Sequence, residues 1–205
     1  MNILFRVDAS LQMGTGHVMR CLTLSHALRD RGAHCWFICR EHPGHLLEQI
    51  RQAGFEAIAL PLADQCDRPS PPADQPRLVH APWLGATWSE DAAQTLAALG
   101  QDRPDWLIVD HYALDHRWQA QLRLHCGKIM VIDDLADRDH DCDLLLDQNL
   151  VADLEHRYDQ RLPPTAPACW VRAMPSSSPP MGSYTPHPAS TGAGAADLGL
   201  LWWGG

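Results

Sequence analysis

MNILFRVDASLQMGTGHVMRC, residues 1–21, is the stretch of sequence that decides the fold. An apolar run at residues 3–7 leads into a glycine-containing loop, and apolar residues then recur three or four positions apart, as in Val18, Cys21 and Leu22. A short apolar run bounded by turn residues is typical of a buried strand, and the wider spacing is typical of an amphipathic helix. The stretch therefore predicts a strand, a loop and a helix in that order.

The same alternation continues along the chain to residue 147. The expected strands are Ile3–Val7, Cys35–Cys39, Glu56–Leu60, Trp106–Asp110, Lys128–Ile132 and Leu144–Asp147. The expected helices are His17–Arg31, His45–Ala53, Glu90–Leu99 and Asp115–Cys126, with Gly32 and Gly54 as C-terminal caps of the first two. Strands that alternate with helices favour the α/β class, here a Rossmann-like parallel sheet with flanking helices.

Residues 61–87 interrupt this alternation. They are rich in Pro, Asp and Gln and have no clear period, so we expect a long loop that Trp83 helps to anchor. Long ordered loops of this kind often face a ligand.

The final segment of the chain differs in composition from the rest. Between Leu162 and Gly205 the only charged side chains are Arg172 and Asp197, and eight of the chain's 16 prolines occur there. Such a segment has too little apolar surface to offset the entropy lost on ordering. We therefore expect a folded domain at residues 1–160 and a disordered tail at residues 161–205.

Charge and cysteine content narrow the function classes. The 205 residues have a formal net charge of -9, which disfavours a broad surface for nucleic acid or anionic membrane. The seven cysteines form an odd count without metal-type spacing, and neither a secretory leader nor an apolar run of about 18 residues is evident. We expect a cytoplasmic protein with reduced thiols that binds small molecules.

The loop at residues 8–17 lies at the predicted carboxyl edge of the sheet, where open α/β sheets bind ligands. Gly14 and Gly16 allow the backbone to approach a ligand closely, and the helix that follows offers free N–H groups to an anion. The pattern is not GxGxxG, and it is not a Walker loop because GK[ST] is missing. A dinucleotide or ATP cofactor is therefore not expected.

His17 stands at the start of the predicted helix. A helix N-terminus disfavours the protonated imidazole and keeps a lone pair available for general base catalysis. The alternative is that His17 only caps the helix or packs in the loop. Arg20, one turn further, can bind a substrate carboxylate or phosphate, or it can simply be solvated.

Two further strand ends place polar residues at the same edge. Asp110 and Tyr112 follow one strand, and Asp133 and Asp134 follow the next. Asp110 can orient an imidazole or bind a sugar hydroxyl, and it can equally cap the following turn. Asp133 and Asp134 are expected to point to opposite sides, as loop-capping carboxylates and not as a metal pair. The stretch 138–143 fits no common ligand spacing, so no metal site is predicted.

Three blocks of sequence, in their order and spacing, carry a family resemblance. They are NILFRVDASLQMGTGHVMRCLTLSHALRDRGAHCWFICRE at residues 2–41, DWLIVDHYALD at 105–115 and KIMVIDDLADRDHDCDLLLDQN at 128–149, followed by Arg157 and Tyr158. Together they resemble the N-terminal domain of the UDP-2,4-diacetamido-2,4,6-trideoxy-β-L-altropyranose hydrolases of pseudaminic acid biosynthesis, over roughly residues 1–160.

The resemblance implies a GT-B-like enzyme with two Rossmann-type domains and its substrate in the cleft. It implies metal-independent hydrolysis without a cofactor, in which water attacks the anomeric carbon of a UDP-sugar and UDP leaves with inversion. His17 is the implied catalytic base. Residues implied to shape the sugar side of the cleft are Gly14, Gly16 and Arg20, with Tyr112 as a further candidate. The second domain would supply most of the nucleotide pocket.

The expected start of that second domain does not follow Asp159. A Pro-, Ser- and Gly-rich segment stands there, and a frameshift near residue 165 would account for it. On this interpretation the chain is a truncated and inactive form, because it lacks the binding energy of the nucleotide pocket. Two other interpretations stay open. One is a GT-B glycosyltransferase in which His17 deprotonates an acceptor hydroxyl, and the other is a non-catalytic sugar-binding module.

Overall fold

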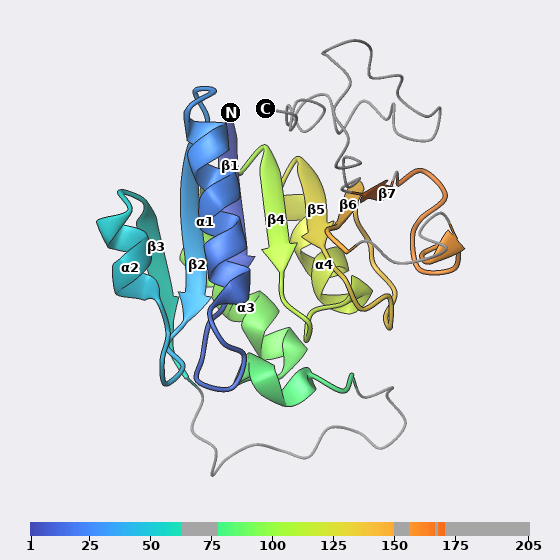
Figure 1. Cartoon of the computed structure of the whole chain (residues 1–205), viewed down its shortest axis with the longest axis horizontal. Coiled ribbons are helices and arrows are strands. Elements are labelled where there is room, and N and C mark those ends of the chain that lie inside the picture. Colours follow the sequence, from blue (N-terminus) through green and yellow to red (C-terminus); the bar gives the residue numbers. More distant parts are fainter. Residues whose placement is uncertain (63–77, 150–155, 167, 171–205) are drawn as a thin grey trace, which may run out of the picture.

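The computed structural model describes residues 1–62, 78–149, 156–166 and 168–170, which form a parallel sheet with helices on both faces (Figure 1). The strands are β1 (Asn2–Val7), β2 (His34–Arg40), β3 (Glu56–Leu60), β4 (Trp106–Asp110), β5 (Lys128–Ile132), β6 (Leu144–Asp147) and β7 (Ala168–Trp170). The helices are α1 (Gly16–Arg29), α2 (Leu47–Gln52), α3 (Trp88–Leu99) and α4 (His116–Leu122), with short 3-10 helices η2 (Ala81–Leu84) and η3 (Arg123–His125). The strand order is β3-β2-β1-β4-β5-β6-β7. The predicted Rossmann-like α/β class is confirmed.

Alternate strand residues fill two core layers. Ile3, Phe5 and Val7 of β1 belong to the layer that includes α1 and α2, whereas Leu4 belongs to the layer that includes α3 and α4. All four side chains are fully buried, and Figure 1 shows the two pairs of helices on opposite faces of the sheet. Because both faces are covered, the central strands are apolar almost throughout, which makes them recognisable as continuous runs.

The bounds of the strands agree with the prediction more closely than those of the helices. β3, β4, β5 and β6 match residue for residue. α1 ends at Arg29, before the predicted end, because Gly32 adopts a left-handed φ of 84° and the following N–H donates to Leu28 O at 3.1 Å. Gly54 has a φ of 83° after α2. Both predicted glycine caps are confirmed.

α3 begins two residues before its predicted start at Glu90. Thr87 Oγ1 accepts from the Glu90 N–H at 3.2 Å, and the Glu90 carboxylate accepts from the Thr87 N–H at 2.8 Å. This reciprocal pair is a capping box, which satisfies two N–H groups at the helix start. The TxxE pattern therefore defines the true start of α3.

β7 corrects the predicted boundary between domain and tail. It lies within the segment 161–205 that was expected to be disordered, yet it pairs in parallel with β6, with Ala168 opposite Leu145. Pairing with an open strand edge depends on backbone hydrogen bonds, which the side-chain composition of a long segment does not report. Residue 167 and residues 171–205 of the predicted tail lie outside the described residues.

The predicted loop at residues 61–87 is described only in part, because residues 63–77 lie outside the described residues. Its second part forms η2, where Leu84 is 1% exposed and Trp83 is half-buried. Both side chains therefore anchor this part of the chain, Leu84 by full burial in the core and Trp83 by partial burial.

Residues 156–166 are tied to the sheet through Tyr158, which is buried. Its hydroxyl lies 3.0 Å from Asp133 O and 3.1 Å from Asp147 Oδ2. Burial, together with the charges of the two aspartates, raises the pKa of Tyr158, so the phenol stays a hydrogen-bond donor. Arg157 donates to Asp147 Oδ2 at 2.8 Å beside it. This segment therefore lies against the carboxyl ends of β5 and β6.

No helix within the described ranges combines the length and the apolar character needed to cross a membrane.

Candidate active site

The loop between β1 and α1 reverses the chain at the carboxyl edge of the sheet (Figure 1). Ser10 organises it, because Oγ accepts from the Met13 N–H at 2.9 Å and the carbonyl accepts from the Gly14 N–H at 2.8 Å. Gly14 has a φ of 77°, which side chains rarely tolerate. Thr15 makes no side-chain cap to α1, so its hydroxyl does not accept from the N–H groups of the first helical turn.

The two predicted loop glycines differ in what they require. Gly14 needs its positive φ, whereas Gly16 does not have one, and a Cβ at either position would meet no atom within 4 Å. Gly14→Ala is therefore expected to lower the free energy of unfolding by about 1–2 kcal/mol. Gly16→Ala is expected to leave it within about 0.5 kcal/mol. Urea denaturation measures both, and equal losses would contradict this backbone argument.

His17, in the first turn of α1, pairs with Asp110 at the end of β4. Nδ1 of His17 lies 2.7 Å from Asp110 Oδ1, and the side chains are 9% and 0% exposed. A carboxylate oxygen can only accept, so this contact requires a proton on Nδ1. In the neutral ring the lone pair is then on Nε2. Within the described residues Nε2 has no hydrogen-bond partner and is not among the enclosed polar atoms. His17 therefore offers a base on the nitrogen that faces away from Asp110.

Arg20 holds the same carboxylate from a second side. Its Nε donates to Asp110 Oδ2 at 2.5 Å and its Nη2 donates to Oδ1 at 2.6 Å. Nη2 also lies 3.1 Å from His17 Nδ1, but a protonated Nδ1 cannot accept from it. Burial alone would raise the pKa of Asp110, yet the hydrogen bonds from Arg20 and His17 hold it below its ordinary value. Asp110 is therefore ionised, and it fixes both the tautomer and the orientation of His17.

Tyr112 and Asp134 complete the group. The Tyr112 hydroxyl donates to Asp134 Oδ1 at 2.5 Å, and Arg20 Nη1 lies 3.5 Å from Asp134 Oδ2. The rings of Tyr112 and His17 meet edge to face, with centroids 4.5 Å apart. Burial and the hydrogen bond to Asp134 raise the pKa of Tyr112, so it remains a neutral donor.

The structure brings the sequence-predicted residues together, with Gly14 and Gly16 in the adjoining loop. Those in mutual contact are His17, Arg20, Asp110 and Tyr112. Asp134 is a member that the sequence assigned to loop capping. The sequence feature that could have indicated this membership was the position of Asp134 at a strand end. The carboxylate of the neighbouring Asp133 instead accepts from the Ala136 N–H at 2.9 Å. The two neighbouring aspartates face different surroundings, as expected.

A second group of charges, which the sequence analysis missed, lies fully buried on the α3 face of the sheet. Arg6 donates to Asp8 Oδ1 at 2.6 Å and to Asp91 Oδ2 at 2.5 Å. Arg40 donates to Asp91 Oδ2 at 2.7 Å, and its backbone N–H donates to Asp8 Oδ1 at 2.6 Å. All four side chains are 0% exposed. The two arginines thus balance the charge of the two aspartates. The sequence feature that could have revealed this cluster was the presence of charged residues within apolar strands.

Two buried histidines border this cluster. Nε2 of His111 lies 3.3 Å, and Nε2 of His42 lies 3.7 Å, from Asp8 Oδ2. The Nδ1 of His111 accepts from the Ala113 N–H at 3.0 Å, so the proton of the neutral ring is on Nε2. Burial lowers the pKa of His111, which keeps it neutral. His111 therefore presents an N–H, and not a lone pair, toward Asp8.

The buried cluster predicts loss of stability in acid. Burial alone would raise the pKa of Asp8 and of Asp91, but Arg6 holds both below their ordinary values. A carboxyl with a depressed folded-state pKa contributes stability that is present above its unfolded pKa of about 3.9 and is lost as pH falls through the folded value. Urea midpoints should therefore decline below about pH 4. A midpoint that is constant from pH 5 to about pH 2 would contradict this.

The stretch 138–143 has structural contacts. Arg138 Nη2 lies 2.7 Å from Asp133 Oδ1, and Nδ1 of the buried His140 lies 3.1 Å from Gln119 Nε2. These contacts join the loop before β6 to β5 and α4. Over the described part of the chain, no group of three or more His, Cys, Asp or Glu side chains is arranged to hold a metal ion.

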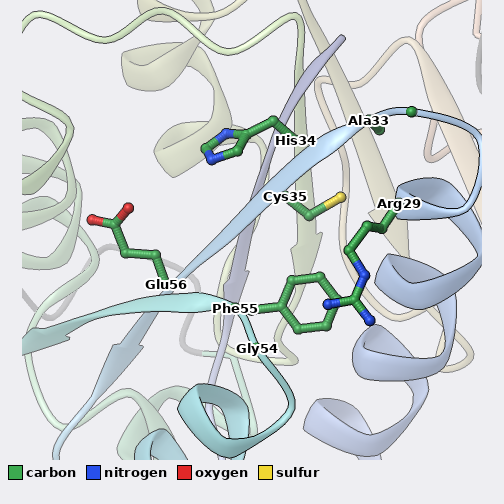
Figure 2. Close-up of a pocket in the computed structure, with 8 residues that line it drawn as sticks. Arg29, Ala33, His34, Cys35, Gly54, Phe55 and Glu56 are labelled. Carbon is green, nitrogen blue, oxygen red and sulfur yellow. The ribbon is translucent and has the colours of Figure 1, made fainter.

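A shallow hollow of about 320 Å³ lies at the opposite, amino edge of the sheet (Figure 2). The guanidinium of Arg29 lies over the Phe55 ring, with Cζ 4.5 Å from the centroid. Burial raises the pKa of the Cys35 thiol to about 11, so this thiol stays protonated at neutral pH. The hollow contains none of the residues of the candidate active site.

Comparison with known proteins points to one curated relative. Over 153 residues the chain is 26% identical to the UDP-2,4-diacetamido-2,4,6-trideoxy-β-L-altropyranose hydrolase of Campylobacter jejuni, covering 74% of this chain and 43% of that protein. The chain is similar to this hydrolase. The resemblance carried by the sequence blocks is thus confirmed, and the chain spans less than half the length of the hydrolase. No family model matches.

Two solved structures align with part of this chain. MurG of Acinetobacter baumannii aligns with a TM-score of 0.45 and 15% identity, over 88% of this chain and 43% of that one. The calicheamicin glycosyltransferase CalG4 aligns with a TM-score of 0.38 and 21% identity, over 75% of this chain and 34% of that one.

Proposed function

We propose that this chain forms the N-terminal, sugar-side domain of a UDP-sugar hydrolase in which His17 is the general base. The observation that carries the proposal is the 2.7 Å contact between His17 Nδ1 and Asp110, which places the lone pair of the neutral ring on Nε2. The similarity to the Campylobacter jejuni hydrolase supports the substrate class, a UDP-activated diacetamido-trideoxy sugar. Five cysteines are free thiols, in keeping with a cytoplasmic protein, namely Cys21, Cys35, Cys39, Cys126 and Cys142.

The proposed reaction needs a base that takes a proton from water and an anionic group that stabilises the positive charge on the protonated base. Nε2 of His17 takes a proton from water as the water oxygen bonds to the anomeric carbon, and the bond from that carbon to the UDP oxygen breaks with inversion. The electron pair leaves with UDP, whose phosphate oxygen is stable as an anion. Asp110 stabilises the imidazolium that forms, because it is ionised and hydrogen-bonded to Nδ1. No metal or cofactor enters this scheme.

The remaining site residues have binding roles in this proposal. Arg20 and Asp134 present hydrogen-bonding groups beside Tyr112, and Gly14 and Gly16 let the loop backbone approach the sugar. The nucleotide pocket is proposed to lie in a second domain, because the relative is more than twice as long as the matched segment. Binding energy from the nucleotide would then position the anomeric carbon at His17.

Release of UDP from the diacetamido-trideoxy UDP-sugar tests the proposal, with a restored full-length protein in which residues 1–160 are followed by the proposed second domain. Release without any added acceptor supports hydrolysis. Release that requires an acceptor hydroxyl would show instead a glycosyltransferase in which His17 deprotonates that acceptor. Binding of the sugar without turnover under either condition would show a sugar-binding module.

A further inference from the structure

A row of aromatic rings extends from His17 to η2, a segment that the proposed mechanism does not use. Tyr112 packs against His17, and the centroid of its ring also lies 5.3 Å from that of His80 and 6.0 Å from that of Trp83. The His80 and Trp83 rings are 4.5 Å apart. Residues almost 30 positions apart in the sequence thus form one aromatic wall, which we define as His80, Trp83 and Tyr112.

The wall is held in place by its backbone. The Trp83 N–H donates to His80 O at 2.9 Å, and Leu84 is buried directly after it. Gly85 has a φ of 71°, and a Cβ there would come within 2.6 Å of His42 Cε1, so this turn packs closely on the sheet. Among the described residues, the enclosed Nδ1 of His80 has no hydrogen-bond partner. The ring contact between His80 and Trp83 therefore contributes to holding the two side chains.

The three rings of the wall are only half-buried, and charged groups lie beside one of them. Tyr112 and Trp83 retain partial exposure, and Asp134 and Arg20 hydrogen-bond beside the Tyr112 hydroxyl. Aromatic faces with a few placed polar groups are the usual lining of a small-molecule site. The negative face of an aromatic ring attracts the polarised C–H groups of a sugar ring and of an acetamido methyl.

We propose that this aromatic wall is the subsite for the sugar ring and an acetamido methyl group of the substrate. The inference rests on the proposed function, which places the anomeric carbon at His17. Because the Tyr112 ring lies 4.5 Å from the His17 ring, a group bound against Tyr112 lies close to that carbon. Uracil does not satisfy this condition, because ribose and two phosphates separate it from the anomeric carbon. The wall therefore selects for the N-acetylated sugar.

Trp83→Ala in the full-length protein tests the subsite, with Trp88→Ala as the matched control. Trp88, the first residue of α3, is also half-buried, but its ring packs on Arg117 of α4. We expect Trp83→Ala to raise KM for the UDP-sugar about tenfold, equivalent to about 1.4 kcal/mol, with UDP affinity unchanged. Trp83→Phe, which keeps a ring, should recover most of this loss. Saturation-transfer NMR with free N-acetylglucosamine should show a weaker acetyl-methyl signal in Trp83→Ala alone.

The outcomes separate the subsite from the proposed function. Weaker UDP affinity of Trp83→Ala with an unchanged acetyl-methyl signal would overturn the subsite, and would indicate that the wall binds the uracil ring. Equal effects of Trp83→Ala and Trp88→Ala would overturn it as well. If the methyl signal depends on Trp83 while no UDP is released, the subsite stands and the hydrolase function is wrong.

Discussion

His17→Gln is expected to lower kcat for UDP release by about 10²–10⁴-fold, the range typical for loss of a general base. Gln cannot take a proton from water, and it is close in size to His. KM and UDP affinity should change little, because the base acts in the bond-making step. Steady-state kinetics of UDP release at neutral pH measures the effect.

Asp110→Asn is the companion variant for this prediction. The amide can donate to Nδ1 and so favour the tautomer with its lone pair toward residue 110, which leaves Nε2 protonated. We expect a loss of at least about 10²-fold in kcat, although Asp110 does not touch the water. Turnover within twofold of the natural protein for His17→Gln would exclude His17 as the base. A large loss for His17→Gln alone would show that Asp110 does not set the tautomer.

Asp91→Ala is expected to lower the free energy of unfolding by about 3–5 kcal/mol, the largest stability effect that we expect in this chain. Asp91 accepts from Arg6 and Arg40, both fully buried, and from the Trp118 indole at 2.9 Å. Its removal leaves two guanidinium groups without their shared anion in a region of low dielectric. Urea denaturation at neutral pH measures the loss.

The control is Asp139→Ala, which breaks an ion pair with Arg161 whose side chains are 55% and 40% exposed. Solvent screens such pairs, so this loss should stay within about 1 kcal/mol. If Asp91→Ala does not fold, Asp91→Asn should show a smaller loss in the free energy of unfolding, because its amide oxygen can still accept a hydrogen bond. A loss in Asp91→Ala no greater than in Asp139→Ala would contradict the interpretation of the cluster as an enclosed charge network.

The sequence was most informative where the physical cause is local. The strands β3 to β6 follow from apolar runs that are bounded by turn residues, and the caps at Gly32 and Gly54 follow from a conformation that only glycine adopts readily. His17 was recognisable as a candidate base because its position at a helix start is itself a local property. β7 was missed because its pairing depends on the free edge of β6, which composition does not encode.

The chemical partners lie beyond the reach of local patterns. His17 and Asp110 are 93 positions apart, and Arg6 and Asp91 are 85 positions apart. Their contacts exist because β1 pairs with β4, with Val7 opposite Asp110, and because α3 packs across the other face of the sheet. Asp134 joined the site for the same reason, since β5 lies beside β4. No single segment contains the information that brings these side chains together.

The sequence by itself determined the α/β class, the loop with Gly14, and an imidazole at the helix start, because hydrophobic period and backbone conformation act over a few neighbouring residues. Only the tertiary structure decided which ring nitrogen of a neutral His17 carries the lone pair, because that depends on the Asp110 carboxylate 2.7 Å from Nδ1. It also decided that Trp83 lies beside Tyr112 and that Arg6 is neutralised in the core. Hydrogen bonds and ion pairs act over a few ångströms of space, and parallel strand order sets which distant residues share that space.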